Sequence, residues 1–349
     1  MAAYTTIDDP TLHFQVLTYT GDGESTRALT LPGDTDMAPD LVWIKQRNTT
    51  RNQQVNDRVR GTSKVLLADL SDAEDATGGT VKAYGTDGFS VNDSANANED
   101  SGTYVAWCWK ANGSGSSNTT GTINTTATSA NTTSGFSIST YTGTGSAATI
   151  GHGLGAVPDV VIVKGRTIAA SWRMYHSANN NTDYMTLSTT DYVVTSGSNW
   201  NDTTPTSTVF SLGTDAAING SYNYLAYAWT SIQGFSKFGG YTGNGNADGP
   251  YIHLGFKPAF LICKRKDSGG VNNWKATDHK RDPHNMVRAT MNLDSNGAEG
   301  AEDHVDFLAN GFKIRRDGND INNNGGTYIY LAWAEAPFVN SNGVPCNAR

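Results

Sequence analysis

Tyr141-Thr142-Gly143-Thr144-Gly145 begins a pattern that occurs three times in this chain. The same arrangement of tyrosine, threonine and two glycines stands at 19–23 as Tyr-Thr-Gly-Asp-Gly and at 241–245 as Tyr-Thr-Gly-Asn-Gly. Glycines spaced in this way favour a tight turn, because glycine adopts backbone conformations that other residues avoid. The recurrence predicts a repeated structural unit.

Each copy of the turn is followed by two further shared features. The first is a proline that opens an apolar run ending on lysine, and the second is a closing segment rich in aromatic residues. The runs occupy 39–45, 158–164 and 258–264, and the closing segments occupy 104–109, 224–229 and 330–335. The prolines lie 119 and 100 residues apart, which is the length of a small domain and too long for a solenoid repeat. We therefore predict three homologous modules in tandem.

Strand signals dominate between these landmarks. Short runs rich in Val, Ile, Thr, Tyr, Phe and Trp alternate with clusters of Gly, Asn, Asp and Ser, and helix signals are nearly absent. This spacing is typical of antiparallel sandwiches. The predicted fold is all-β, with three jelly-roll-like antiparallel β-sandwich modules.

Composition indicates where the modules begin and end. Residues 111–135 are mostly Ser, Thr, Asn and Gly, with Ile123 as the only large aliphatic residue, so this segment is predicted to be a linker with a short strand around Ile123. The full prediction is an amino-terminal arm at 1–15, sandwich modules at 16–110, 136–230 and 235–338, the linker at 111–135 and a carboxy-terminal tail at 339–349.

Charge and cysteine content narrow the class of protein. The chain has 349 residues, of which 37% are hydrophobic and 17% charged, and its net charge of -8 argues against binding to nucleic acid or anionic membrane. No apolar run is long enough for a membrane span, and the amino terminus lacks the features of a signal peptide, so we expect synthesis in a cytoplasm. Three cysteines, two of them in apolar segments, predict neither a disulfide framework nor a zinc site.

The apolar runs and the closing segments are hydrophobic at consecutive positions. Both faces of such strands need cover, one from the facing sheet and the other from a neighbouring module or subunit. We therefore expect a homo-oligomer, with a trimer as the leading arrangement. A central strand of a large sandwich would show the same pattern.

Motifs for chemistry are weak throughout the sequence. The glycines at 151–155 precede a strand, whereas a dinucleotide loop follows one, and the segment 293–299 holds only fragments of a calcium loop. Glu74, Glu99 and Glu302 each precede an aspartate, but acidic pairs in polar stretches usually only solvate a loop. We predict no catalytic residues, no metal and no cofactor.

Several segments resemble a family of tail-fibre and virion structural proteins of tailed bacteriophages, especially marine ones. The resemblance covers nearly the whole chain and rests on residues 4–10, Tyr-Thr-Thr-Ile-Asp-Asp-Pro, on 150–158, on Trp172 with Tyr175-His176, and on 200–210. The first module departs from it, since it has Arg-Asn-Gln-Gln at 51–54 where the others have Trp172 and Trp274.

The resemblance implies a virion component without enzymatic activity. The function expected from it is that of a tail-fibre or host-attachment component, made in the host cytoplasm and displayed on the particle, with other virion proteins as partners. A capsid decoration or head-fibre protein is the alternative within structural proteins. A carbohydrate-active enzyme acting on host surface glycan is the alternative from another class.

Aromatic residues provide the candidate binding sites. The candidates for contact with a host glycan, which stacks on aromatic rings, are Trp172, Tyr175, His176, Trp274 and His279. The alternative is that the tryptophans pack in the core or against a neighbouring module.

The amino-terminal arm carries a second set of candidates. Tyr4, Ile7, Leu12 and Phe14 place apolar side chains in a segment too short to form a core, and they are candidates for attachment to a neighbouring virion protein. The alternative is that Leu12 and Phe14 begin the first strand and that the arm packs locally.

Overall fold

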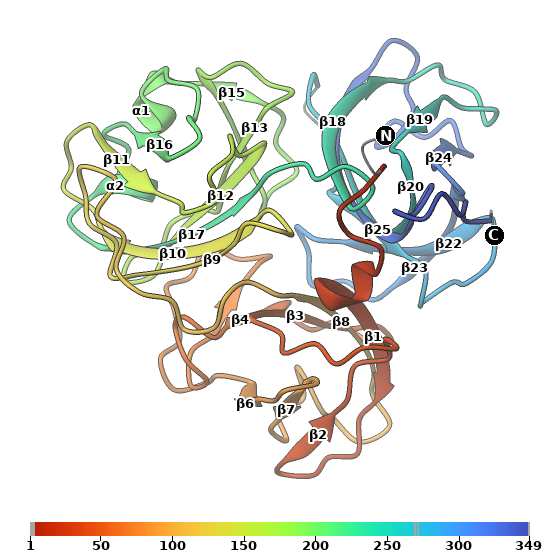
Figure 1. Ribbon diagram of the computed structural model, residues 1–349, viewed down its shortest axis with the longest axis horizontal. Helices are drawn as coiled ribbons and strands as arrows, with labels where there is room; N and C mark the ends of the chain where they lie inside the picture. Colours follow the sequence, from red (N-terminus) through yellow and green to blue (C-terminus); the bar gives the residue numbers. More distant parts are fainter. Residues whose placement is uncertain (1–3, 269, 271, 348–349) are drawn as a thin grey trace.

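The computed structural model describes residues 4–268, 270 and 272–347, which form three lobes of β-sheet around a common centre (Figure 1). We name them lobe 1 (residues 14–109), lobe 2 (127–229) and lobe 3 (236–337). Helix in the described residues is limited to three single turns: η1 (Pro10–Leu12), α1 (Gly197–Trp200) and α2 (Ala216–Asn219). The prediction of an all-β antiparallel sandwich fold is confirmed.

Lobe 1 is a two-layer sandwich. Its larger sheet has the strand order β1 (Phe14–Thr20), β8 (Thr103–Trp109), β3 (Leu41–Gln46), β4 (Gln54–Asp57) and β5 (Leu66–Leu67). The smaller sheet has the order β2 (Arg27–Leu29), β7 (Phe89–Val91) and β6 (Val81–Tyr84). A core that includes Leu29, Ile44 and Phe89 fills the space between the two sheets.

Lobe 2 has the same layers with additions at the sheet edges. Its larger sheet runs β15 (Val194–Thr195), β14 (Asp183–Thr186), β13 (Arg173–His176), β12 (Val160–Gly165), β17 (Asn223–Trp229), β10 (Phe136–Thr142) and β9 (Ala127–Asn131). The pair β11 (Ala148–Gly151) and β16 (Val209–Leu212) forms the second layer. The predicted linker therefore contains a strand, at β9 rather than around Ile123, which makes only an isolated bridge to Ile150.

Lobe 3 is one continuous sheet of eight strands, ordered β18 (Ser236–Thr242), β25 (Thr327–Pro337), β20 (Phe256–Arg265), β21 (Lys275–Asp278), β22 (Val287–Asn292), β23 (Gly300–Leu308), β24 (Gly311–Ile314) and β19 (Tyr251–His253). Phe312 of β24 packs edge-on against Tyr241 of β18 and Tyr330 of β25, so the far end of the sheet folds back over its start. This lobe therefore encloses its own core with a single sheet.

Strand pairing follows one register in the three lobes. The closing strands β8, β17 and β25 lie between the opening strand and the proline-led strand, and they place Trp109, Trp229 and Trp333 at equivalent positions. In the same register Tyr104 corresponds to Tyr224 and Tyr328. The third closing segment of the sequence pattern is thus equivalent from Tyr328 onward, two residues earlier than the pattern indicated.

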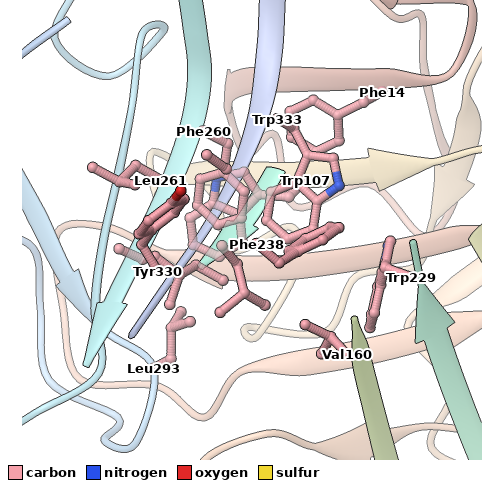
Figure 2. Close-up of a cluster of buried hydrophobic side chains, with 14 of the residues drawn as sticks. Phe14, Trp107, Val160, Trp229, Phe238, Phe260, Leu261, Leu293, Tyr330 and Trp333 are labelled. Carbon is pink, nitrogen blue, oxygen red and sulfur yellow. The ribbon is translucent and has the colours of Figure 1, made fainter. Parts of the chain in front are cut away.

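The three equivalent tryptophans meet at the centre of the molecule. Ring centroids of Trp109, Trp229 and Trp333 lie 5.3 to 6.2 Å from one another, and Phe14 and Phe260 stack onto the same group. Figure 2 shows side chains of all three lobes meeting here, among them Phe14, Trp229 and Trp333. We call these rings, together with the buried apolar residues of all three lobes that pack around them, the hub. The large sheet of each lobe turns one apolar face toward the hub. That face is therefore covered by the neighbouring lobes of the same chain.

The hub changes the argument about oligomers. Uncovered apolar faces were the reason to expect a trimer of chains, and the three lobes provide that cover within one chain. A homo-oligomer remains a prediction, but it no longer follows from burial.

Candidate functional site

Four of the five predicted glycan contacts are buried. Trp172, Tyr175, His176 and Trp274 are each at most 4% exposed, so a surface glycan does not reach them and their prediction as glycan contacts is corrected. Their rings pack between lobes or in the core of lobe 2, because a large flat apolar surface gains most from burial there. The packing alternative accounts for both tryptophans.

Each of these tryptophans joins two lobes by a hydrogen bond. The indole Nε1 of Trp172 in lobe 2 donates to the carbonyl of Leu67 in lobe 1 at 2.8 Å, and that of Trp274 in lobe 3 donates to the carbonyl of Thr186 in lobe 2 at 3.0 Å. We call the contact between two lobes a seam. The two bonds occupy equivalent positions in the 1–2 seam and the 2–3 seam.

Lobe 1 performs the same task with a different residue. Gln53 stands at the equivalent position, and its Nε2 donates to the carbonyl of Asn292 in lobe 3 at 2.8 Å. Its Oε1 accepts from Trp43 Nε1 at 2.9 Å. The departure of the first module from the tryptophan pattern therefore preserves the seam contact, since an amide also carries the required donor.

The three lysines that end the apolar runs also lie at the seams. Lys45, Lys164 and Lys264 are each one residue from the end of their strand and are fully buried, and burial lowers the pKa of each ammonium group to about 8. Nζ of Lys164 donates to Ser71 O in lobe 1 at 3.0 Å, and Nζ of Lys264 donates to Thr190 O in lobe 2 at 2.8 Å. Backbone carbonyls of the adjacent lobe thus bind two of these cations.

Carboxylates bridge arginines across two of the seams. Glu74 of lobe 1 binds Arg60 of its own lobe at 3.0 Å and Arg166 of lobe 2 at 2.9 Å. Burial acts to raise the pKa of Glu74, but the two arginines outweigh it, and the net shift of the pKa is downward. Glu299 of lobe 3 binds Arg281 of its own lobe and Arg47 of lobe 1 in the same way.

A buried aspartate supports each of these arginines. Asp57 binds Arg60 and accepts from the hydroxyl of Tyr227 in lobe 2 at 2.8 Å. Asp278 binds Arg281 and accepts from Trp107 Nε1 in lobe 1 at 3.0 Å. Sequence analysis did not find these networks, although the shared spacing Asp-x-x-Arg after β4 and β21 was visible.

The 2–3 seam is built differently. His176 stands where the other lobes have Asp57 and Asp278, and its Nδ1 accepts from Ala178 N while Nε2 lies 3.2 Å from Tyr330 O in lobe 3. This pair of contacts requires the neutral tautomer with the proton on Nε2. Burial lowers the pKa of His176 to about 4, so the ring is uncharged at neutral pH.

The glutamates of two acidic pairs weighed for glycoside hydrolysis have partners within their own lobes. Glu99 binds Gln46 and Arg51, and Glu302 binds Lys275 and Arg316, so each carboxylate is held by a cation of its own lobe. Among the residues that the structure describes, no three His, Cys, Asp or Glu side chains cluster as metal ligands. No helix in the described residues is long and apolar enough to cross a membrane.

Two of the surface depressions carry aromatic or imidazole side chains on or beside their walls. The first, of about 360 Å³, lies where the arm meets lobe 3 and is lined by Tyr4, Lys237 and His253 among others. Next to it, Tyr251 is 44% exposed and its hydroxyl lies 3.2 Å from Nδ1 of His253. We call this site the tyrosine hollow, and it offers aromatic rings, an imidazole and an ammonium group to a ligand.

The second depression, of about 380 Å³, lies between β1 and lobe 3. His279 is on its wall, with Nδ1 3.1 Å from the carbonyl of Ala259. Of the five predicted glycan contacts, His279 lines this surface depression, whereas the other four are buried. Sequence reasoning missed Tyr251 and His253, which show only as an alternating strand, Tyr-x-His.

The amino-terminal arm is bound to its own chain. Ile7 is 3% exposed, Phe14 is in the hub, and the hydroxyl of Tyr4 donates to the carbonyl of Gly255 in lobe 3 at 2.9 Å. Leu12 is half-buried in η1. Ile7 and Phe14 are therefore covered by their own chain, and their prediction as attachment residues is corrected. Attachment of another protein through the half-buried Tyr4 and Leu12 stays a prediction.

These features define an all-β protein in which several buried or half-buried polar groups join three lobes, with aromatic and polar groups exposed at one surface hollow. A domain of unknown function, DUF7483, matches residues 9–337, and the chain belongs to this family. No curated protein matches the sequence.

Proposed function

We propose that this protein is a non-enzymatic structural component of a bacteriophage particle, displayed on its surface as a tail-fibre or host-attachment component. The observation that supports the proposal is the use of ionisable groups that are buried or half-buried between lobes. Lys164, Glu74, Arg166, Glu299 and Arg47 are all engaged in lobe-to-lobe contacts, which is the arrangement of a rigid scaffold. The assignment to a bacteriophage particle rests on the resemblance of the sequence to virion proteins.

In this function the tyrosine hollow contacts the host glycan. Tyr251 presents an exposed ring on which the apolar face of a sugar can stack, and His253 and Lys237 provide polar groups beside it. The hollow lies on a rigid sheet, since Ile252 between the two exposed residues is buried in the hub cluster. Rigid support lowers the entropic cost of binding.

Other virion proteins are the proposed partners, and the particle is the proposed location. An image reconstruction of the intact particle, with the protein located by a specific antibody fragment, tests both and also measures the copy number. Density at the tail supports the proposal. Density on the capsid would favour a decoration or head-fibre protein instead, and absence from purified particles would refute the virion assignment.

Glycan contact is tested separately with purified protein. Binding to an array of bacterial surface polysaccharides is compared for the unaltered chain, for Tyr251→Ala and for Tyr222→Ala, a control in lobe 2 that is 41% exposed. We expect Tyr251→Ala to lower binding at least tenfold and Tyr222→Ala to leave it unchanged. Equal binding by the two variants would exclude the hollow, and release of reducing ends from a bound polysaccharide would indicate an enzyme.

A further inference from the structure

The tyrosine hollow lies between the two edge strands of lobe 3. β18 and β19 are the first and last strands of its sheet, and in the described residues they pair with β25 and β24 rather than with each other. The side chain of Lys237 reaches from β18 to β19, where its Nζ donates to the carbonyl of His253 at 2.8 Å. Both residues line the hollow, so the ammonium group lies at its wall.

In the part of the chain that the structure describes, the ammonium group of Lys237 has no carboxylate oxygen within 4.0 Å. Lys313 on the same lobe, by contrast, pairs with Asp248 at 2.8 Å. An ammonium group has three donors, and the carbonyl of His253 accepts one of them. The hollow therefore keeps a positive charge that a ligand can neutralise.

None of the described residues that line the hollow is acidic. Besides Lys237 and His253, the wall offers the hydroxyl of Ser231 and the amide of Gln233, both at exposed positions. The rest of the lining consists of Tyr4, Ser236, Phe238, Leu254 and Gly255. An anionic group in the hollow thus meets a cation and neutral hydrogen-bonding groups, and no acidic side chain of the lining opposes it.

The negative charge of the chain lies mainly on another lobe. Lobe 1 holds 8 basic and 14 acidic residues, a net charge of -6, whereas lobe 3 holds 12 of each. Exposed charges farther apart than about 8 Å are largely screened at physiological ionic strength. The net charge of -8 therefore does not exclude an anionic ligand at the hollow, since lobe 3 is neutral as a whole.

We propose that the tyrosine hollow binds an acidic saccharide, whose carboxylate pairs with Lys237 while its ring stacks on Tyr251. The proposal rests on the glycan contact proposed above and adds the chemical class of the glycan. Hydrogen bonds between ionised groups are roughly twice as strong as those between neutral groups, so the charge discriminates among sugars that can all stack on an aromatic ring. One ammonium group balances one carboxylate, whereas a phosphate monoester carries up to about two negative charges.

The probes are the polysaccharides of the bacterial array that contain uronic acids, each in its native form and after chemical reduction of its carboxylates to alcohols. Reduction removes the charge and keeps the sugar rings, so the pair of probes isolates the contact with the ammonium group. The unaltered chain is expected to bind the native form at least about tenfold more tightly than the reduced form, as measured by biolayer interferometry.

Lys237→Gln removes the charge from the wall and retains a side-chain N–H that can donate to the carbonyl of His253. We expect this variant to bind the native and the reduced forms with equal affinity, and its binding of the reduced form shows that it is folded. Lys280→Gln is the control, because it replaces an exposed lysine of lobe 3 on the wall of the second depression. It should keep the preference of the unaltered chain for the native form.

Tyr251→Ala separates the acidic ligand from glycan contact itself. If the unaltered chain binds both forms equally and Tyr251→Ala weakens both, the hollow holds a neutral glycan and the acidic class is overturned. It is also overturned if Lys237→Gln keeps the preference, or if Lys280→Gln loses it to the same extent. Binding that survives carboxyl reduction but is lost on removal of phosphate groups would assign a phosphorylated glycan instead. Absence of binding to every polysaccharide of the array would refute the glycan contact and the acidic ligand together.

Discussion

Arg47 of lobe 1 and Glu299 of lobe 3 form a two-pronged ion pair, with Nη2 to Oε1 at 2.8 Å and Nε to Oε2 at 2.9 Å. The pair joins residues 252 positions apart and closes the ring of lobes between its last member and its first. Arg166 and Glu74 form the matching pair between lobes 2 and 1. Because each lobe is held by both neighbours and by the hub, we expect the three to unfold together.

The first prediction concerns the carboxylates of the seams. Glu74→Gln removes the charge that Arg60 and Arg166 share, and Arg60 is fully buried there. Arg60 keeps its pair with Asp57, but it loses its second carboxylate and Arg166 loses its partner across the seam. We therefore expect a loss of about 2 kcal/mol in the free energy of unfolding, measured by urea denaturation.

The matched control is Asp303→Asn. Asp303 pairs with Arg288, but both side chains are more than half exposed, so we expect a change within about 0.5 kcal/mol. Equal effects of the two substitutions would show that the Glu74 network does not stabilise the seam.

The second prediction isolates the indole hydrogen bond of the 1–2 seam. Trp172→Phe keeps an aromatic ring but removes the donor to Leu67 O. Trp200 is equally buried, and its Nε1 has no hydrogen-bond partner in the described residues. Both changes remove similar apolar volume, so Trp172→Phe is expected to cost about 1 to 2 kcal/mol more than Trp200→Phe in the same denaturation experiment. A smaller difference would mean that packing alone holds this seam.

The third prediction is a dependence of stability on pH. The pKa of His176 is lowered from 6.5 to about 4 in the folded chain, so below pH 6.5 the unfolded chain binds a proton that the folded chain does not. Stability is therefore complete above pH 6.5 and falls as the pH decreases toward 4, by on the order of 2 to 3 kcal/mol from this residue.

The measurement is urea denaturation of the unaltered chain and of His176→Gln between pH 4 and 7.5. Glutamine retains a donor for Tyr330 O but does not titrate. We expect the variant to have a shallower dependence on pH. Parallel curves would assign the acid sensitivity to other buried histidines, such as His304, whose pKa is lowered to about 3.

The sequence predicts much of the fold because its signals are local. Turn glycines, alternating apolar residues and the absence of helix signals suffice for an all-β assignment, and Pro158 and Lys164 mark the limits of a strand to within two residues. The ends of the third closing strand were harder to place. β25 is longer than its counterparts, so its aromatic residues match them at two registers, and only pairing with β18 distinguishes them.

The sites were less predictable because they depend on contacts between distant segments. A buried tryptophan such as Trp172 cannot be told from an exposed one by its neighbours in sequence. Its hydrogen-bond partner, the carbonyl of Leu67, lies 105 positions away in another lobe. Tyr251 gave no signal, since exposure of one strand face is normal in an antiparallel sheet. The arm was ambiguous for the same reason: its apolar residues indicate that it docks, but they do not indicate on which surface.

The last prediction concerns that arm. Ile7 is 3% exposed in the hub cluster, and the hydroxyl of Tyr4 donates to Gly255 O in lobe 3 at 2.9 Å, so residues 4–9 connect lobe 1 to lobe 3 across the 3–1 seam. Ile7→Ala is expected to lower the free energy of unfolding by about 2 to 4 kcal/mol, because it leaves a cavity in a packed cluster. Thr6→Ala, at the exposed neighbouring position, serves as the control and should change it by less than about 0.5 kcal/mol.

Limited chymotrypsin digestion followed by mass spectrometry distinguishes a structural arm from a free one. Cleavage after Leu12 is expected to be slow in the unaltered chain and at least several-fold faster in Ile7→Ala, because loss of the Ile7 contact releases the segment that protects η1. If the unaltered chain is cut rapidly at Tyr4 and Leu12 while the lobes stay intact, the arm is free in solution. The contacts with lobe 3 would then be too weak to hold it, and its apolar residues would again be available to a partner on the particle.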